Sequence, residues 1–497
     1  MTMAGNAKKG ALLAAATDME PIHGSIEVDV PADILWRGFN KPNLWPRWNP
    51  CFFWCRNKTL RLGDKLVWCF EPIRPWYLYK MFAIANIIEL EEGKKVTWEV
   101  TALPGFYAHH TYSIDDLGDG RSRFTSWEKA YGWGFRLTRL FWLKHFTFVR
   151  NRSLEGARAL EIVHLTGEKL DATGIPPRSY FNFLAAVAGL LALIVAFAAL
   201  GAWALLVAVA EAAIGVALWF YAAYVKLRPV RLAPGVHALL GGGGNTLVVE
   251  DGEDTLLADT KFPPGSWLLR RWLRQEGIGP VTKMINTHYH YDHSRGNVLF
   301  PEAECIAHEL TRQAMDRVDG SWWTRHRGVE PTHVFDGERT TIMVGAREVE
   351  LIFLGHGHTV GDVAVNVVAA GVIATSDIIF NGYYCYMDLH REGMSVPGTI
   401  EALRRFAGEH PKAIFMPGHG PIARAAELLR TAAYLEDLMR QVSAARAAGK
   451  SLAATLAAVD LTEWDLQILP SFHQNRLEWA TARSSIRAMY QLLERAG

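Results

Sequence analysis

The segment 181–225 reads FNFLAAVAGLLALIVAFAALGAWALLVAVAEAAIGVALWFYAAYV and contains one ionisable side chain, that of Glu211. A helix that crosses a bilayer needs about 20 apolar residues, so this segment is too long for one such helix and long enough for two. Aromatic residues lie at its outer ends, and basic residues flank it at Arg178 and Lys226. We therefore expect a two-helix transmembrane hairpin that breaks near Gly201. Because basic loops stay in the cytoplasm, both ends of this hairpin should face the cytoplasm.

This interpretation predicts a multi-pass protein of the inner (cytoplasmic) membrane, with the parts before and after the hairpin both on the cytoplasmic side. The alternative is a buried pair of helices inside a globular domain, because small residues allow close helix packing in either setting.

The rest of the composition limits the other possibilities. A chain of 497 residues exceeds what one hydrophobic core holds, which predicts several domains. Its formal net charge of +1 leaves no basic excess for a polyanion, so we expect no nucleic-acid partner. Five sparse cysteines favour a reducing compartment without a disulfide framework.

Residues 20–165 alternate strand-like runs with turn signals. The run IHGSIEVDV leads into a short helix at PADILWRGF, several strand candidates follow, and a helical stretch from about 134 to 165 closes the segment. This order predicts an α+β domain in which the long helix lies across a curved antiparallel sheet.

The opening VDVPADILWRGFNKPNLWPRWNP, with this order of elements, resembles the START-like superfamily of polyketide cyclase and lipid-transfer domains. The resemblance implies a helix-grip fold that binds an apolar ligand in a cavity between helix and sheet. The aromatic residues near Trp45 and Trp48 fit such a cavity and fit an ordinary aromatic core equally well. We expect His109 and His110 to be strand residues, one facing inward and one outward, rather than ligands.

A different chemistry begins at NTHYHYDHSRGN, residues 286–297, where four possible metal ligands occupy six positions. In an extended segment His288, His290 and Asp292 would alternate onto one face, and His293 would follow on the next turn. That geometry argues against a single ion with four ligands. It favours His288 and His290 on one ion and Asp292 with His293 on a second ion nearby.

Three further candidates follow at predicted strand-to-loop junctions, where a rigid scaffold presents ligands: His358 in GHGHT, Asp377 in GVIATSDIIF and His419 in PGHG. The set then holds five histidines and two aspartates. Imidazole-rich sets of this kind suit zinc better than calcium or magnesium.

The motifs HxHxDH, GHT, a strand-end Asp and PGHG, in this order, resemble those of the metallo-β-lactamase-fold hydrolases over residues 232–430. The resemblance implies an αββα sandwich with a two-metal site at one edge. It implies that Asn245 and Asp259 support the site from an early pair of strands. It also implies the ligands: His288, His290 and His358 for the first ion, Asp292, His293 and His419 for the second, and Asp377 bridging both.

The resemblance favours two zinc ions over iron. Flavodiiron relatives place a glutamate where this chain has His290, which argues against a di-iron centre. Single-iron persulfide dioxygenases share much of the motif, so iron stays an alternative.

The loops near the motifs carry aromatic and basic residues that fit either a substrate wall or packing and exposure: Trp322, Trp323, Tyr383, Tyr384, Tyr386, Arg325 and Arg327. We expect His356 to lie outside the ligand set, beside a ligand or facing solvent. Residues 431–497 read as amphipathic helices that cap the domain or mediate self-association.

Together these features predict a membrane-anchored dinuclear zinc hydrolase that cleaves an ester, thioester, lactone or amide bond with a metal-activated hydroxide. Asp292 would orient the hydroxide and transfer its proton. The combination of bilayer anchor and ligand-binding domain favours a lipophilic small-molecule substrate. The alternatives are a phosphodiester hydrolase or iron-dependent oxygenase of the same fold, or a non-catalytic lipid-binding protein.

Overall fold

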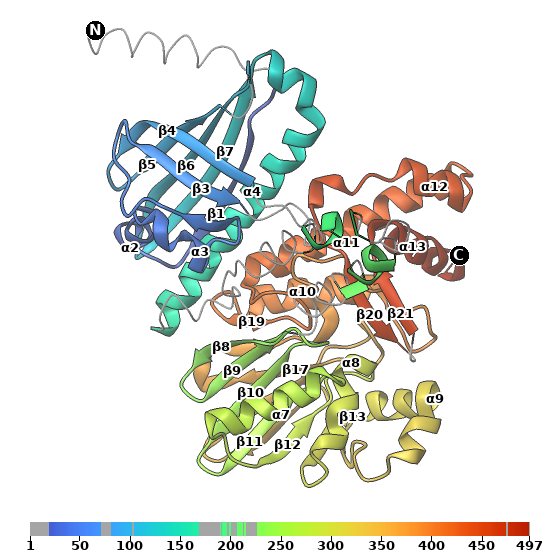
Figure 1. Cartoon of the computed structure of the whole chain (residues 1–497). Coiled ribbons are helices and arrows are strands. Elements are labelled where there is room, and N and C mark those ends of the chain that lie inside the picture. Colours follow the sequence, from blue (N-terminus) through green and yellow to red (C-terminus); the bar gives the residue numbers. More distant parts are fainter. Residues whose placement is uncertain are drawn as a thin grey trace, which may run out of the picture. The chain divides into compact units, whose positions relative to one another are not determined.

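The structure, a computed structural model, describes residues 19–70, 81–101, 104–167, 226–473 and 476–496, and within the apolar segment only 189, 191–195, 198–199, 206–211 and 213–214. The chain divides into two compact units, Met1–Trp219 and Phe220–Gly497, each of which is described by itself (Figure 1).

The N-terminal unit is built on one antiparallel sheet in the order β1-β7-β6-β5-β4-β3-β2. The long helix α4 (Trp133–Thr166) packs against β1 and β7, and the short helices α2 (Ala32–Phe39) and α3 (Trp45–Trp48) lie between β1 and β2 in the chain. The strands are β1 (Ile22–Val28), β2 (Phe52–Cys55), β3 (Lys65–Phe70), β4 (Met81–Glu91), β5 (Lys95–Val100), β6 (Tyr107–Gly118) and β7 (Arg121–Tyr131). The order of strands and long helix agrees with the α+β prediction, whereas the START-like resemblance stays a prediction.

Aromatic rings fill the core of this unit. Trp98 lies at the centre, with ring centroids 5.7 Å from Trp45 and 5.2 Å from Tyr112. His110 stacks on Trp98 at 4.4 Å and pairs with buried Glu128. Its neighbour His109 bonds Glu99 instead, with Nε2 and Oε2 3.0 Å apart, because successive side chains of a strand point to opposite faces.

The C-terminal unit contains two larger sheets. The first has the order β14-β13-β12-β11-β10-β9-β8, antiparallel from β8 to β11 and parallel from β11 to β14. Its strands are β8 (Arg228–Ala233), β9 (Val236–Leu240), β10 (Thr246–Asp251), β11 (Asp254–Ala258), β12 (Val281–Ile285), β13 (Glu304–His308) and β14 (His333–Phe335).

The second sheet has the order β15-β16-β17-β18-β19 and is antiparallel except for the parallel pair β18 and β19. Its strands are β15 (Arg339–Val344), β16 (Arg347–Phe353), β17 (Val363–Val367), β18 (Val372–Ala374) and β19 (Ile414–Met416). Both sheets bury apolar side chains such as Val248, Leu257, Leu351 and Val365 completely.

Helices cover both sheets. Helix α7 (Gly265–Glu276) buries Leu269 and Leu273 in the core of the first sheet, and α10 (Val396–Glu409) and α11 (Ala425–Ala447) contribute to the core of the second. Helix α9 (Glu309–Arg325) follows β13. Apolar residues on one stripe of each helix produce this αββα order, because each stripe must be covered.

The last part of the chain differs from the all-helical prediction for 431–497. It contains α12 (Leu452–Ala458) and α13 (Ala482–Ala496), and also a hairpin of β20 (Leu469–His473) and β21 (Arg476–Ala480). Strand β20 packs against α8 (Tyr291–Ser294), the short helix that follows the first histidine motif. The residues from 461 to 496 are called the C-terminal extension below.

The prediction of a transmembrane hairpin over 181–225 is wrong on this structure. Among the residues described, no helix is both long and apolar enough to cross a membrane. The rest of 181–225 lies outside the described residues, and the predicted multi-pass location in the inner membrane falls with the hairpin. Hydropathy was an insufficient basis, because apolar runs occur in buried and in lipid-facing helices alike.

Candidate metal centre

The histidine motif begins just after β12 and runs into α8. His288 lies in the connecting turn, His290 directly precedes α8, and Asp292 and His293 belong to α8 itself. Asp292 is therefore in a helical turn and not in an extended segment as predicted. This turn still sends Asp292 and His293 to a different position from His288 and His290.

The other three candidates come from the second sheet. His358 lies in the loop between β16 and β17, Asp377 in a short turn after β18, and His419 in the loop after β19. All seven side chains are buried, and the structure brings them together.

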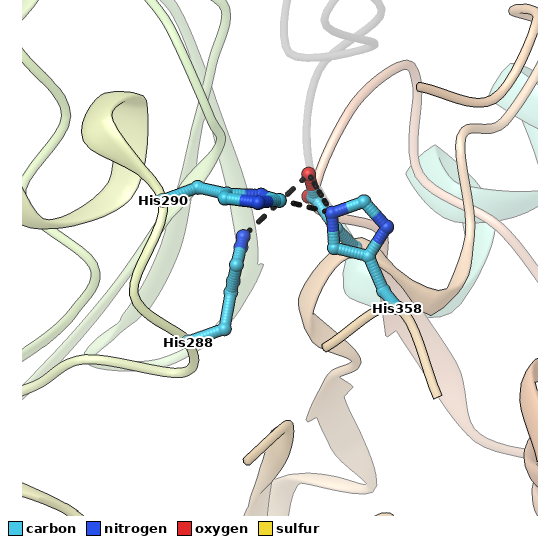
Figure 2. A group of neighbouring side chains, drawn as sticks. His288, His290 and His358 are labelled. Atoms are coloured by element: carbon cyan, nitrogen blue, oxygen red, sulfur yellow. Dashed lines mark hydrogen bonds and ion pairs between the residues drawn. The ribbon is translucent and has the colours of Figure 1, made fainter. Parts of the chain in front are cut away.

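His288, His290, His358 and Asp377 form the first group, with ligand atoms within 4.8 Å of one another. Figure 2 shows its three histidines, whose rings lie close to one another. His290 Nδ1 lies 3.0 Å from His358 Nε2. Asp377 Oδ2 lies 3.6 Å from His358 Nε2 and 3.8 Å from His288 Nε2.

The second group is formed by Asp292, His293 and His419, whose ligand atoms also lie within 4.8 Å of one another. His419 Nε2 lies 3.2 Å from Asp292 Oδ2. Asp377 reaches this group too, because its Oδ1 lies 3.2 Å from His293 Nε2 and its Oδ2 lies 3.4 Å from His419 Nε2. The Asp377 carboxylate is thus shared by both groups.

Hydrogen bonds on the outer nitrogens of the imidazoles fix their orientation. His293 Nδ1 lies 2.7 Å from Asp259 Oδ2, and His288 Nδ1 lies 3.1 Å from Ser376 Oγ. Such partners select the tautomer that leaves the inner nitrogen available to a metal ion.

His290 has the opposite ring orientation to His288 and His293, because its Nδ1 and not its Nε2 faces the ligand group. Its Nε2 lies 3.0 Å from Asp388 Oδ2, so the Nε2–H donates to this carboxylate and Nδ1 faces His358. A buried carboxylate accepts only, which assigns the imidazole proton to Nε2. Two inner nitrogens 3.0 Å apart then require a proton or a cation between them.

The early strands brace the site, as the resemblance implied for Asn245 and Asp259. Asn245 Nδ2 donates to the carbonyls of Pro417 and Gly420 at 2.8 and 2.9 Å, which holds the loop of His419. Asp259 accepts the backbone N–H of Thr287 at 2.9 Å as well as bonding His293.

Two glycines allow the close approach of these loops. A Cβ at Gly244 would overlap the imidazole of His293, and a Cβ at Gly418 would overlap the carboxylate of Asp377. Only glycine leaves room for the ligand side chains at these positions.

Burial keeps His288 and His358 of the first group neutral in the metal-free protein. Desolvation, with the charge of His293 as the next cause, holds the pKa of His288 well below its usual range. Burial lowers the pKa of His358 to about 3. Both imidazoles therefore offer lone pairs at neutral pH.

The second group is ion-paired instead. Burial opposes a charge on His293, but Asp377, Asp259 and Asp292 together raise its pKa well above the usual range. Burial is likewise overcome at His419, where Asp377 and Asp292 raise the pKa to about 9.

Sequence reasoning missed three buried groups around the site. Asp388 carried no metal-type signal in YMDLH. Asp362 follows His358 by four residues, accepts the backbone N–H of Thr359 at 2.8 Å, and has a pKa that burial raises to about 7. Lys261 donates to the carbonyls of Leu239, Gly241 and Gly244 at 2.9, 2.6 and 2.7 Å, and burial lowers its pKa to about 7.

The aromatic residues predicted near the site separate into different roles. Tyr386 lies beside the first group, with its ring centroid 5.8 Å from that of His290. The rings of Trp322 and Trp323 lie beside the guanidinium of Arg295, whose Cζ is 3.8 and 5.1 Å from their centroids. The ring centroid of Tyr384 lies 6.3 Å from that of Tyr434. The remaining members of the set do not contact the seven candidate ligands in any described interaction: Tyr383, Arg325 and Arg327.

His356 is exposed, and its Nε2 lies 2.6 Å from the carbonyl of Gly393. It anchors the loop between β16 and β17 and does not join the ligand groups.

The donor set fits metal ions. His288 Nε2 is buried and has no hydrogen-bond partner, while its other nitrogen is bonded to Ser376. A buried polar atom without a partner is costly, and a metal ion would satisfy it. Five imidazoles with two carboxylates suit zinc or a similar transition metal.

Parts of this chain are similar to known proteins. The model of the Metallo-beta-lactamase superfamily matches residues 239–419. The 2,4-dinitroanisole O-demethylase subunit alpha of Nocardioides sp. (strain JS1661) is 31% identical over 153 residues, 30% of this chain and 44% of that protein. The chain therefore spans less than half the length of this curated relative.

Among solved structures, a metallo-beta-lactamase from Pontibacter korlensis is 21% identical and covers 42% of this chain and 99% of its own, with a TM-score of 0.36. The stereoselective inverting sec-alkylsulfatase Pisa1 from Pseudomonas sp. is 14% identical, over 53% of this chain and 50% of its own, with a TM-score of 0.42. The family match over residues 239–419, together with the αββα layers and the clustered histidines and aspartates, shows that the C-terminal part of this chain has the metallo-beta-lactamase fold.

Proposed function

We propose that the C-terminal unit is a dinuclear zinc hydrolase that cleaves an ester, thioester, lactone or amide bond. The observation that supports it most is the sharing of one buried carboxylate, Asp377, by two groups of ligand-type side chains. The first ion would be held by His288, His290 and His358, and the second by Asp292, His293 and His419, with Asp377 between them.

When bound, the ions would supply a water of lowered pKa and polarise the scissile bond. The chain's own residues would do the rest. Asp292, whose Oδ2 lies 3.2 Å from His419 Nε2, would accept a proton from the attacking water and return it to the leaving group. Water adds across the bond, so no further reactant is needed.

The relative from Nocardioides makes an activated aryl ether a second candidate substrate, because its name describes O-demethylation of 2,4-dinitroanisole. Hydrolysis of such an ether would use the same activated water and release an alcohol and a phenol. The prediction of a lipophilic substrate rested on the bilayer anchor combined with the ligand-binding domain, and without the anchor it is not part of this proposal.

Metal analysis of the full chain, paired with turnover on p-nitrophenyl esters, a thioester, a lactone, bis(p-nitrophenyl) phosphate and 2,4-dinitroanisole, tests the proposal. We expect two zinc ions and turnover of a carboxylic acid derivative. Iron in place of zinc, or turnover of the phosphodiester alone, would contradict it.

Two variants locate the activity. Asp292→Ala should lower kcat by about 10³-fold or more, because it removes a proton acceptor and a ligand. Asp437→Ala is the matched control, because Asp437 bonds Trp464 and Gln441 away from the site and its loss should leave turnover unchanged. Equal activity of wild type and Asp292→Ala would refute the assignment.

A further inference from the structure

The loop of residues 381–390, which follows Asp377, is fastened by residues of the C-terminal extension. The backbone N–H of Gln467 donates to Gly382 O at 2.9 Å, and the N–H of Tyr384 donates to Gln467 O at 3.0 Å. Ser485 Oγ donates to Cys385 O at 3.4 Å, and Arg495 donates to Leu389 O. These partners lie far beyond His419 in the chain, outside the residues that match the family model.

The same loop presents Asp388 to the first ligand group. The carboxylate is only 1% exposed, and it accepts the Nε2–H of His290 at 3.0 Å and the hydroxyl of Tyr289. Its Oδ1 accepts the backbone N–H of His390 at 2.9 Å. Three donors stabilise the buried charge and fix its position.

The position of Asp388 decides which nitrogen of His290 faces the ligand group. With Nε2–H bonded to Asp388, Nδ1 carries the lone pair and lies 3.0 Å from His358 Nε2. Without this acceptor, the imidazole could rotate about χ2 or carry its proton on Nδ1, and either change removes the lone pair from the group.

The extension also reaches the second group. Strand β20 packs against α8, the helix of Asp292 and His293. The hydroxyl of Tyr386, whose ring lies 5.8 Å from that of His290, is hydrogen-bonded to Glu478 on β21. The extension therefore contacts both the loop 381–390 and α8.

We propose that the C-terminal extension is a positioning element of the metal centre, which acts through Asp388 to orient His290 as a ligand of the first ion. Asp388 is a positioning residue in this account and does not bind the ion itself. The inference rests on the proposed function only in that metal ions bind at this site.

Metal affinity of the full chain tests the inference without any substrate. The protein is stripped of metal with a chelator and titrated with Zn²⁺ against a chromophoric competitor, and with Co²⁺ while its d–d spectrum is recorded. We expect Asp388→Ala to weaken the first ion about 10- to 100-fold and to change the Co²⁺ spectrum. Asp388→Asn should rescue part of the affinity, because its one carbonyl oxygen can still accept the His290 Nε2–H, although the bond from the backbone N–H of His390 is then lost.

Matched controls separate positioning from general stability. Asp437→Ala removes a carboxylate that bonds Trp464 of the extension at 3.0 Å without contacting the loop 381–390. Arg495→Ala should weaken the first ion several-fold, whereas Arg446→Ala, which removes a bond to Tyr490 O at 2.9 Å, should not.

Wild-type affinity for the first ion in Asp388→Ala would overturn the inference, and so would an equal loss in Asp437→Ala. If Asp388→Ala does not fold, Tyr289→Phe and Arg495→Ala carry the test, and unchanged affinity in both would overturn it. A chain that binds two ions with this pattern and hydrolyses nothing would refute the proposed function and leave this inference standing.

Discussion

The two halves of the candidate metal centre are built from the same residue types, histidine and aspartate, but their buried imidazoles differ in charge. In the first group, burial keeps His288 and His358 neutral, and His290 Nδ1 faces His358 Nε2 at 3.0 Å. In the second group, His293 and His419 are paired with the carboxylates of Asp292 and Asp377. His288 and His358 of the first group therefore carry no charge when the site is empty, whereas His293 and His419 of the second group are positively charged.

Because of this difference, metal binding to the two groups should depend differently on pH. An ion entering the first group meets lone pairs and displaces few protons. An ion entering the second group must displace protons from imidazoles whose pKa is raised, which lowers its affinity as the pH falls.

The largest effect should come from removing the residue that joins the halves. Asp377→Ala should lose both bound ions and lower turnover by at least about 10³-fold, because its carboxylate approaches ligands of both groups. Metal content and kcat measure this. If the variant retains two tightly bound ions, Asp377 is not a shared ligand of the two groups.

A smaller effect, confined to one half, is expected at Lys261. Lys261→Met leaves three buried carbonyls without their donor and should lower the free energy of unfolding by about 2–4 kcal/mol. It should weaken the second ion more than the first, because Gly244 N–H bonds Asp292 O at 3.1 Å.

Urea unfolding and the Zn²⁺ titration measure both consequences. Lys283→Met is the control, because Lys283 forms a partly exposed pair with Asp254 at 3.7 Å and should cost less than about 1 kcal/mol. If Lys261→Met lowered the affinity for both ions equally, the predicted difference between the two groups would be wrong.

A moderate effect should appear with pH. The pKa of His419 is raised from its ordinary value of 6.5 to about 9 on folding, so its ion pairs stabilise the metal-free protein fully below pH 6.5. This stabilisation is lost as the pH rises through 9. We expect the melting temperature of the metal-free protein to fall between about pH 7 and pH 10, and His419→Gln to flatten that fall.

Over the same pH window the affinity for the second ion should rise relative to that for the first. Thermal unfolding in a chelator and Zn²⁺ titrations at several pH values provide the measurement. A melting temperature that rises across the window would contradict the ion-paired description of the second group.

The smallest effect is expected at His356. His356→Ala should change the affinity of either ion by less than about twofold and stability by less than about 1 kcal/mol, because the side chain is exposed and bonds only Gly393 O in the described structure. A large loss of affinity for one of the ions in this variant would show that His356 contributes to the binding of that ion.

The resemblance to a known family implied the αββα layers of the C-terminal part, and the strand-like runs that end in turns predicted where the ligand motifs lie. The sequence predicted the seven candidate ligands because their spacing recurs in a known family. It failed only for the backbone at Asp292, which lies in the helical turn α8 and not in an extended segment, since the two conformations leave similar patterns over four residues.

The apolar segment 181–225 shows the opposite case. Its hydropathy favoured a membrane hairpin, yet no described helix is long and apolar enough to span a bilayer. Hydropathy reports that side chains avoid water and does not report what covers them.

By itself, then, the sequence determined which atoms can bind metal in this chain, because imidazole and carboxylate chemistry is a property of residue type. The tertiary structure alone decided how those atoms are oriented. Asp388 meets His290 from 98 positions away, and Arg495 meets Leu389 from 106 positions away. Such contacts depend on how distant elements pack, and no local pattern of the chain encodes them.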